Sequence, residues 1–190
     1  MKQQYENEVI DQSEFDDVDE IVDVEFIDCK IDSVNFFSKK ITCCVFVNTT
    51  VQNTNLSMST LHNTQFNGVR FENCKLLGLN FNHCKQMLFE VNFRNCILDF
   101  SSFENMKMSE TSFVDCSMKG VDFVGTILEK SKFLNADLQD AVFMQTNLKQ
   151  ADLTTAYNFM INPAQNFVKK AIFSENNLAG LLYPFEITIV

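Results

Sequence analysis

The sequence contains no tryptophan, and it has only 5 glycines, 2 prolines and 2 histidines among its 190 residues. So little glycine and proline excludes a collagen-like chain or a flexible linker. No apolar run approaches the roughly 18 residues of a membrane-spanning helix, so we expect no membrane span. The polar, acidic N-terminus does not resemble a secretory signal, and we therefore expect a cytoplasmic protein.

Motifs of catalysis are missing too. There is no Gly-rich phosphate loop and no His-Glu-x-x-His motif, and neither His62 nor His83 lies in sequence beside a Ser or Cys arranged as a nucleophile. His83 and Cys84, with Cys74 nearby, form the one ligand-like cluster, but it lacks a repeated Cys-x-x-Cys spacing, so we expect no metal site. We also expect no cofactor and no enzymatic activity.

Large apolar residues recur at every fifth position between residues 91 and 153. They are Phe93, Leu98, Phe103, Met108, Phe113, Met118, Phe123, Leu128, Phe133, Leu138, Phe143, Leu148 and Leu153. The residue two positions before each of them is mostly small, and the other three are mostly polar. A period of five fits neither a helix nor a strand. It predicts a solenoid in which each coil contacts only its neighbours.

Residues twenty apart lie in one column if four five-residue units make a coil. Phe93, Phe113 and Phe133 then form one column of rings, and the set beginning with Phe103 forms the opposite one. The volume per layer is therefore nearly constant, as a close-packed interior requires. The number of such units predicts about seven coils and a rod roughly 32 Å long, at about 4.8 Å per coil.

An earlier register of the same kind runs from Ile21 to Phe81. The next central residue, Leu88, follows after seven residues instead of five, so we expect a register break near residues 82–88, absorbed by a bulge. Lys39 occupies a small inward position; because an unpaired inward ammonium is costly, we expect a local distortion with Lys39 turned outward. We expect Gly78 to supply a backbone angle that other residues avoid.

Most of the seven cysteines also follow the five-residue repeat. Five of them occupy the small inward position, and a sixth, Cys84, does so if the first register continues; the five are Cys29, Cys44, Cys74, Cys96 and Cys116. We expect them to be buried, reduced thiols that act as small apolar residues.

The units with Ala136-Asp137-Leu138 and Ala151-Asp152-Leu153 resemble the pentapeptide repeat, whose consensus is roughly Ala-(Asp/Asn)-Leu-x-x. In that family four pentapeptides form one square coil, and the central residue and the small residue two positions before it point inward. The resemblance implies an all-β solenoid, a right-handed quadrilateral parallel β-helix.

Two further stretches resemble the Qnr-type quinolone-resistance branch of that family. One is the opening, with Ile10-Asp11, Phe15 and the segment 26–31; the other is Leu77-Gly78-Leu79 with the residues up to Cys84, which resembles the point where those proteins are divided in two. The resemblance implies a homodimer that imitates duplex DNA and shields DNA gyrase or topoisomerase IV from quinolones or toxins. Long loops that project from the best-known Qnr proteins are missing, so the chain is similar to the loopless members.

The formal charge of −10 is concentrated at one end. Residues 1–32 contain twelve acidic and two basic side chains, which leaves thirteen of each sign in residues 33–190. This balance excludes general nucleic-acid binding, because phosphates would be repelled. It is compatible with binding a basic groove of another protein, or with an acidic terminus that only keeps the molecule soluble. The candidate partner-binding residues are Asp16, Asp17, Asp19, Glu20, Asp23 and Glu25.

After Leu153 the five-residue beat stops. Asn162 with Pro163 predicts a helix start, and Lys169-Lys170 its end. Ser174 predicts a second short helix that ends at Pro184, and residues 185–190 alternate like a strand. This divides the chain into an acidic entry with a partial first coil (1–20), a β-helix (21–155) and a C-terminal cap (156–190).

The ending resembles the dimerisation segment of the family. Its candidate dimer residues are Leu178, Leu181, Leu182, Phe185, Ile187 and Ile189. The same segment could serve as a simple cap without dimerisation.

Other functions remain compatible with the sequence. The acids of the body are distributed over different faces among Lys and Arg; they are Glu90, Asp99, Glu104, Asp115, Asp122 and Asp140. Such a body also suits a scaffolding module with a flat β face for an unrelated partner. A third hypothesis is immunity to a toxin made by the same cell.

Overall fold

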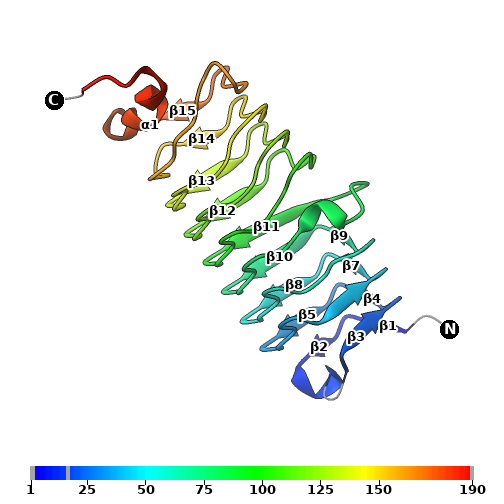
Figure 1. Cartoon of the computed structure of the whole chain (residues 1–190). Coiled ribbons are helices and arrows are strands. Elements are labelled where there is room, and N and C mark those ends of the chain that lie inside the picture. Colours follow the sequence, from blue (N-terminus) through cyan, green and yellow to red (C-terminus); the bar gives the residue numbers. More distant parts are fainter. Residues whose placement is uncertain (1–2, 16–17, 189–190) are drawn as a thin grey trace.

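The computed structural model describes residues 3–15 and 18–188, and it is a rod of stacked coils with its two ends far apart (Figure 1). Short strands, mostly of three residues and separated by tight corners, wind repeatedly around one apolar core. The strands are β1 (Gln4–Glu6), β2 (Val9–Ile10), β3 (Glu20–Val22), β4 (Glu25–Ile27), β5 (Lys30–Asp32), β6 (Lys40–Thr42), β7 (Val45–Val47), β8 (Thr50–Gln52), β9 (Gln65–Asn67), β10 (Val69–Glu72), β11 (Val91–Arg94), β12 (Ser112–Val114), β13 (Lys132–Leu134), β14 (Asp152–Leu153) and β15 (Ile172–Phe173).

Every coil has four faces, which we number from the inward residues of one coil: face 1 at Phe26, face 2 at Ile31, face 3 at Phe36 and face 4 at Ile41. All strand pairs are parallel. Face 1 carries the sheet β1-β4-β7-β9, face 2 a nine-stranded sheet from β2 to β15, and face 4 the pair β3-β6. Face 3 is joined by isolated bridges such as Asn35 with Asn55.

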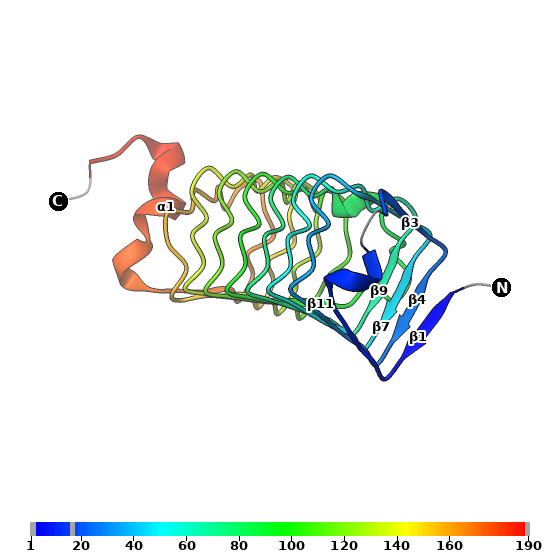
Figure 2. The same ribbon diagram turned by 90° about the horizontal axis from the view of Figure 1, so that it is seen from below.

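The rod is longer than the sequence analysis indicates. Nine strands stacked at about 4.8 Å span about 38 Å on face 2. The first strand of that sheet, β2, precedes residue 21 and the last, β15, follows residue 155. Segments assigned to the entry and to the cap therefore add coils of their own (Figure 2).

Columns of stacked rings fill the interior, as the spacing of twenty predicts. Phe93 and Phe113 lie parallel, with centroids 5.3 Å apart, and Phe103 and Phe123 do so at 5.5 Å. Phe103 meets Phe113 edge to face at 6.2 Å, so the two columns interlock. In the first coils the rings occupy face 1 instead, where Tyr5, Phe26, Phe46 and Phe66 stack.

The small inward residues tie each coil to the preceding one. Thr126 Oγ1 donates to the carbonyl of Phe103 at 2.8 Å, and Thr146 Oγ1 repeats the bond to Phe123. Cysteines take the same position, so Cys74 Sγ donates to Val51 O at 3.3 Å. The predicted burial is confirmed for all six inward cysteines, while Cys43 is half-buried. Burial raises the pKa of the Cys84 thiol.

Most corners turn on a residue with left-handed backbone geometry. Positive φ angles recur at about every fifth residue, for example 56° at Asp23 and 52° at Asp28. Gly78 fulfils the expectation with a φ of 68°. Asn, Asp and Gly suit these positions best, because other L-residues meet a steric penalty there.

A register shift separates the two parts of the rod. Residues that pair between neighbouring coils are 20 positions apart along most of the rod. At one level they are 22 positions apart, as where Val69 of β10 pairs with Val91 of β11 and where Lys75 pairs with Ile97. The expectation that Leu88 enters the core is wrong, since its side chain is 63% exposed and Phe89 is buried instead. A short helix, η2 (Phe81–His83), precedes this segment.

Lys39 is not turned outward into solvent. It is half-buried, and its Nζ donates to the backbone carbonyl of Val18 in the preceding coil. The ammonium finds a partner because the loop before β3 offers a carbonyl at this level of the rod. The costly unpaired charge is thereby avoided.

The C-terminal prediction is partly wrong. Residues 163–170 form no helix; they wind as a further coil, in which Phe167 pairs with Asn147. Asn162 Oδ1 accepts the Ala164 N–H at 2.9 Å, so the predicted cap closes a turn instead. Asn166 is inward and donates to Phe143 O, which holds this segment in the ladder.

The second predicted helix is present, although it is short. Ser174 Oγ accepts the Asn176 N–H at the start of η3 (Glu175–Asn177), which is followed by α1 (Ala179–Leu182) and η4 (Tyr183–Phe185). The strand expected over 185–190 is wrong for its described part, because Glu186 turns left-handed with a φ of 51°. Another short helix, η1 (Gln12–Phe15), belongs to the first coil. No helix in the described ranges is long and apolar enough to cross a membrane.

Candidate interaction surfaces

The acidic tip consists of carboxylates on the first coils, which are exposed except for the half-buried Glu25. Asp19 and Glu20 lie on face 4, Asp23 forms the left-handed corner and Glu25 follows on face 1. Asp16 and Asp17 lie outside the described residues. Glu20 Oε1 lies 4.0 Å from Lys40 Nζ, which is a weak ion pair at the surface. The four described candidates thus follow one edge at the N-terminal end, which Figure 1 shows in blue.

Within the described residues, no coil precedes the first layer of the core. Tyr5 stacks on Phe26 at 5.5 Å, and its hydroxyl donates to Glu14 Oε2 at 3.1 Å. Burial and then Glu14 raise the pKa of Tyr5. A shallow hollow of about 230 Å³ lies beside it. The Tyr5 ring therefore covers the N-terminal end of the core, and acidic residues lie beside it.

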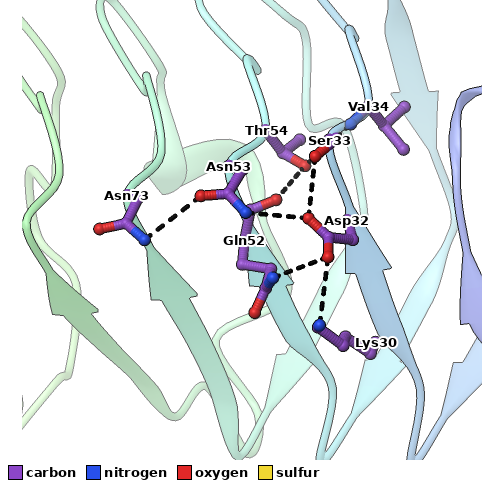
Figure 3. Close-up of polar contacts among 8 residues, drawn as sticks. All are labelled: Lys30, Asp32, Ser33, Val34, Gln52, Asn53, Thr54 and Asn73. Carbon is purple, nitrogen blue, oxygen red and sulfur yellow. Dashed lines mark hydrogen bonds and ion pairs between the residues drawn. The ribbon is translucent and has the colours of Figure 1, made fainter.

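A ladder of amide side chains runs along the corner between faces 2 and 3 (Figure 3). Asn53 Nδ2 donates to Asp32 Oδ1 at 2.9 Å, and Asn73 Nδ2 donates to Asn53 Oδ1 at 3.3 Å. Gln52 and Lys30 bind the other oxygen of Asp32. The Asn53 bond, with help from Lys30, lowers the pKa of Asp32 to about 2. This ladder links coils, so its role is structural.

In the C-terminal half, acids and lysines concentrate on different faces, although the acids as a whole occupy several faces, as expected, with Asp115 and Asp152 outside both groups. Five acids lie on faces 3 and 4 and at the corner between them, with Lys119 among them; this acidic edge is Asp99, Glu104, Asp122, Asp137 and Asp140. Face 1 and its following corner carry five lysines, with Glu110 and Glu129 among them; these lysines form the lysine face: Lys107, Lys130, Lys149, Lys169 and Lys170. The spacing of twenty places these charges in columns, so the sequence already contains this division.

Backbone contacts fix several carboxylates of the acidic edge. Asp99 Oδ1 accepts the Lys119 N–H at 3.0 Å, and Asp122 Oδ1 accepts the Val124 N–H at 2.9 Å. Asp137, only 9% exposed, pairs with Lys119 at 3.4 Å. Asp140 is exposed at the corner. Charge is thus held at defined positions along the rod.

The C-terminal end presents an apolar surface. Phe185 is 67% exposed and Ile187 57%, and Leu178 and Tyr183 are also exposed. Leu181 and Leu182 are half-buried, and Leu181 packs against the core. Ile189 lies outside the described residues. Met160, Phe167 and Ile172 of the last coils add further exposed apolar side chains. A concentration of this kind marks an interaction surface.

Comparison with known families identifies the repeat. A model described as "Pentapeptide repeats (8 copies)" matches residues 42–78, and one described as "Pentapeptide repeat region" matches residues 86–156. Together these matches cover more than half of the chain. The chain belongs to the pentapeptide-repeat proteins.

Solved structures show the same fold in another member of the family, QnrB1, which is described as a plasmid-mediated fluoroquinolone resistance protein. One trypsin-treated form of QnrB1 with a single substitution is similar with a TM-score of 0.65 and 14% identity, over 100% of both chains. A second such form, with a different substitution, gives 0.66 and 14%, over 100% of this chain and 99% of that one. Full-length QnrB1 gives 0.64 and 14%, over 98% and 99%. No curated protein sequence matches this pentapeptide-repeat protein.

The predicted columns and turns are thus those of a known architecture. In the part of the chain that the structure describes, no three His, Cys, Asp or Glu side chains gather in a way that could hold a metal ion. Candidate functional features of this pentapeptide-repeat protein therefore lie on its outer surface: the acidic tip, the acidic edge, the lysine face and the apolar C-terminal end.

Proposed function

We propose that this pentapeptide-repeat protein binds DNA gyrase or topoisomerase IV in the cytoplasm and protects the enzyme from quinolones or toxins by imitating duplex DNA. The observation that carries the proposal is the likeness in fold to QnrB1, a fluoroquinolone resistance protein, over the whole length of both chains. No catalysis is needed, since protection requires only occupation of the DNA-binding surface.

We also propose that two copies join through the apolar C-terminal end. A two-fold axis there would bury Leu178, Phe185 and Ile187 against the same residues of the partner. Two rods of about 38 Å would then span about 76 Å, comparable to roughly 22 base pairs at about 3.4 Å each. Both acidic tips would lie at the distal ends of this dimer.

The charge division suggests which side meets the enzyme. A surface that grips DNA is basic, so it would attract the acidic edge and repel the lysine face. In the dimer the acidic edges, ending at Asp137 and Asp140, would approach the midpoint. We therefore propose the acidic edge as a contact surface in addition to the acidic tip.

The test is gyrase supercoiling in the presence of ciprofloxacin, with and without the purified protein over a concentration series. One variant reverses the tip (Asp19→Lys, Glu20→Lys, Asp23→Lys, Glu25→Lys), and another reverses two acids of the edge, the half-buried Glu104 and the exposed Asp140 (Glu104→Lys, Asp140→Lys). Glu110→Lys with Glu129→Lys, on face 1, makes the same charge change as the edge variant and serves as its control.

Restored supercoiling that is lost in the edge variant, but kept in the control, would support DNA imitation through that edge. Loss only in the tip variant would move the contact to the distal ends. A protein that neither restores supercoiling nor binds gyrase or topoisomerase IV would overturn the proposal. A scaffolding function would then stand, since the mixed charges of the body suit an unrelated partner. Immunity to a toxin made by the same cell would involve the same enzyme target, so a toxin-challenge assay is needed to test it.

A further inference from the structure

Each complete face joins a coil to the preceding one through three backbone groups. On face 1, Ile127 N–H donates to Met106 O at 2.8 Å, and Ile127 C=O accepts from Met108 N–H at 3.0 Å. The third group, Glu129 C=O, accepts from Glu110 N–H at 2.8 Å. These bonds form one rung of a parallel ladder.

One coil below, the equivalent groups have no partner. The corresponding positions are Lys107 N–H, Lys107 C=O and Ser109 C=O, and none of them forms a hydrogen bond within the described residues. The cause is the register shift, because residues 85–90 bulge at the position where the preceding strand of face 1 would lie. Residues 107–109 are therefore an open strand edge in the middle of the rod, and Ser109 at its end lines a gap between this coil and the preceding one.

The residues that line this gap include both apolar and acidic side chains. The gap has a volume of about 500 Å³, and Leu88, Glu90, Ser109 and Glu110 line it with the side chains of neighbouring residues. Glu110 pairs with Lys130 at 3.3 Å, whereas Glu90 forms no ion pair within the described part of the chain. One uncompensated carboxylate thus stands beside the exposed apolar side chain of Leu88.

Two side-chain amides bridge the bulged coil to the following one. Gln86 Nε2 donates to Asn105 O at 3.3 Å, and Asn92 Oδ1 accepts the Ser112 N–H at 2.9 Å. The open edge lies between these two bridges in sequence. Its length suits about three extended residues, at about 3.3 Å each.

We propose that this gap binds an extended segment of a partner protein by strand addition, with one Lys or Arg of that segment facing Glu90. The open edge offers one donor and two acceptors in a row, which match the backbone of an added strand. Glu90 selects a cation, and Leu88 offers an apolar contact to the neighbouring side chain. This binding mode does not depend on the topoisomerase proposal.

Amide hydrogen exchange of the full-length protein, followed by NMR, tests the open edge. In the free protein the Lys107 amide should exchange about a hundredfold faster than the Ile127 amide, its equivalent in the intact next coil. Equal protection of the two amides would overturn the proposal, because the edge would then be closed.

The binding step uses two synthetic peptides, acetyl-Thr-Val-Lys-Val-Thr-amide and the same peptide with Glu at the centre. The lysine peptide should slow exchange at Lys107 and shift the resonances of residues 88–90, and the glutamate peptide should bind more weakly. Shifts confined to other residues, or none at millimolar peptide, would mean that only water fills the gap and would sink the proposal.

Two conservative variants test whether Glu90 is the carboxylate that binds the lysine of the peptide. Glu90→Gln should weaken the lysine peptide about two- to fivefold, as expected for an exposed ion pair. Glu129→Gln, on face 1 of the next coil, should leave its affinity unchanged. Equal effects of the two variants would indicate general electrostatic attraction and contradict binding at Glu90. Gyrase protection can fail without affecting any of these measurements.

Discussion

At the scale of single residues, glycine in one coil makes room for a large corner residue in the coil before it. Phe100 has a φ of 58° and its side chain is 70% exposed. A Cβ added to Gly120 would lie 2.8 Å from the Phe100 ring, and one added to Gly78 would lie 2.7 Å from the Met58 sulfur. The left-handed backbone favours glycine at these corners, although other residues adopt it elsewhere, and the corner residue of the preceding coil leaves no room for a Cβ.

Gly120→Ala should destabilise the protein by about 1–3 kcal/mol, because the left-handed backbone and the contact with Phe100 both oppose a side chain. Urea unfolding followed by circular dichroism measures the change. In a Phe100→Ala background the penalty should be smaller, since the ring is gone and only backbone strain remains. An unchanged penalty in that background would show that the ring plays no part.

Asp32 should make stability depend on acid. Its folded pKa, about 2, lies below the ordinary value of 3.8, so the stabilisation is fully present above about pH 4 and is lost as the pH falls toward 2. Melting temperatures measured between about pH 5 and pH 2 should therefore fall less steeply for Asp32→Asn. Asn53→Ala should flatten the profile more than Lys30→Met, because the Asn53 bond is the larger cause. The reverse order would assign the shift to the ion pair.

At the scale of elements, the five-residue beat predicted the columns because one unit spans one face, so equal spacing in sequence becomes equal position in the coil. Signals at the irregular segments were ambiguous for a physical reason. Asn162 before Pro163 caps a turn as well as a helix, and the amide at Asn166 concealed an inward position that is usually small. Leu88 and Phe89 are adjacent apolar residues, so a two-residue bulge could bury either one.

The capping helix depends on another close contact that sequence alone does not reveal. A Cβ on Gly180 would lie 2.2 Å from Phe159 O and 2.7 Å from its ring. Gly180 C=O also accepts the Ile161 N–H at 2.9 Å. Helix α1 therefore rests on the last coil through backbone at this point.

Gly180→Ala should detach α1 from the last coil, whereas Ala179→Ser, on an exposed neighbour, should not. Hydrogen exchange at Ile161 should rise about tenfold or more, because its acceptor moves away. Sedimentation should show a weakened dimer if the proposed C-terminal interface is correct. Unchanged exchange at Ile161 would mean that the helix adapts to the methyl group without moving.

At the scale of the whole molecule, the two ends of the rod differ in chemistry. The C-terminal end is closed by α1 and exposes apolar side chains, while the N-terminal end leaves β1 and β2 without a preceding coil. Open strand edges pair readily with other chains unless charge prevents it. We therefore expect the acids around Tyr5 to keep one rod from stacking on the end of another, a role that needs no partner.

Neutralising the exposed acids of the first coil, with Glu6→Gln, Glu8→Gln, Asp11→Asn and Glu14→Gln, should produce concentration-dependent end-to-end association. Repulsion between two tips is the barrier, so the wild type should associate more at high salt, where screening shortens the range of charge to about 3 Å at 1 M. Analytical ultracentrifugation measures both effects. The control neutralises four acids elsewhere, Glu104→Gln, Glu110→Gln, Glu129→Gln and Asp140→Asn, and should sediment as the wild type does. If the tip variant also does so, the acids are not what keeps the ends apart, and partner binding is left as the reason for their position.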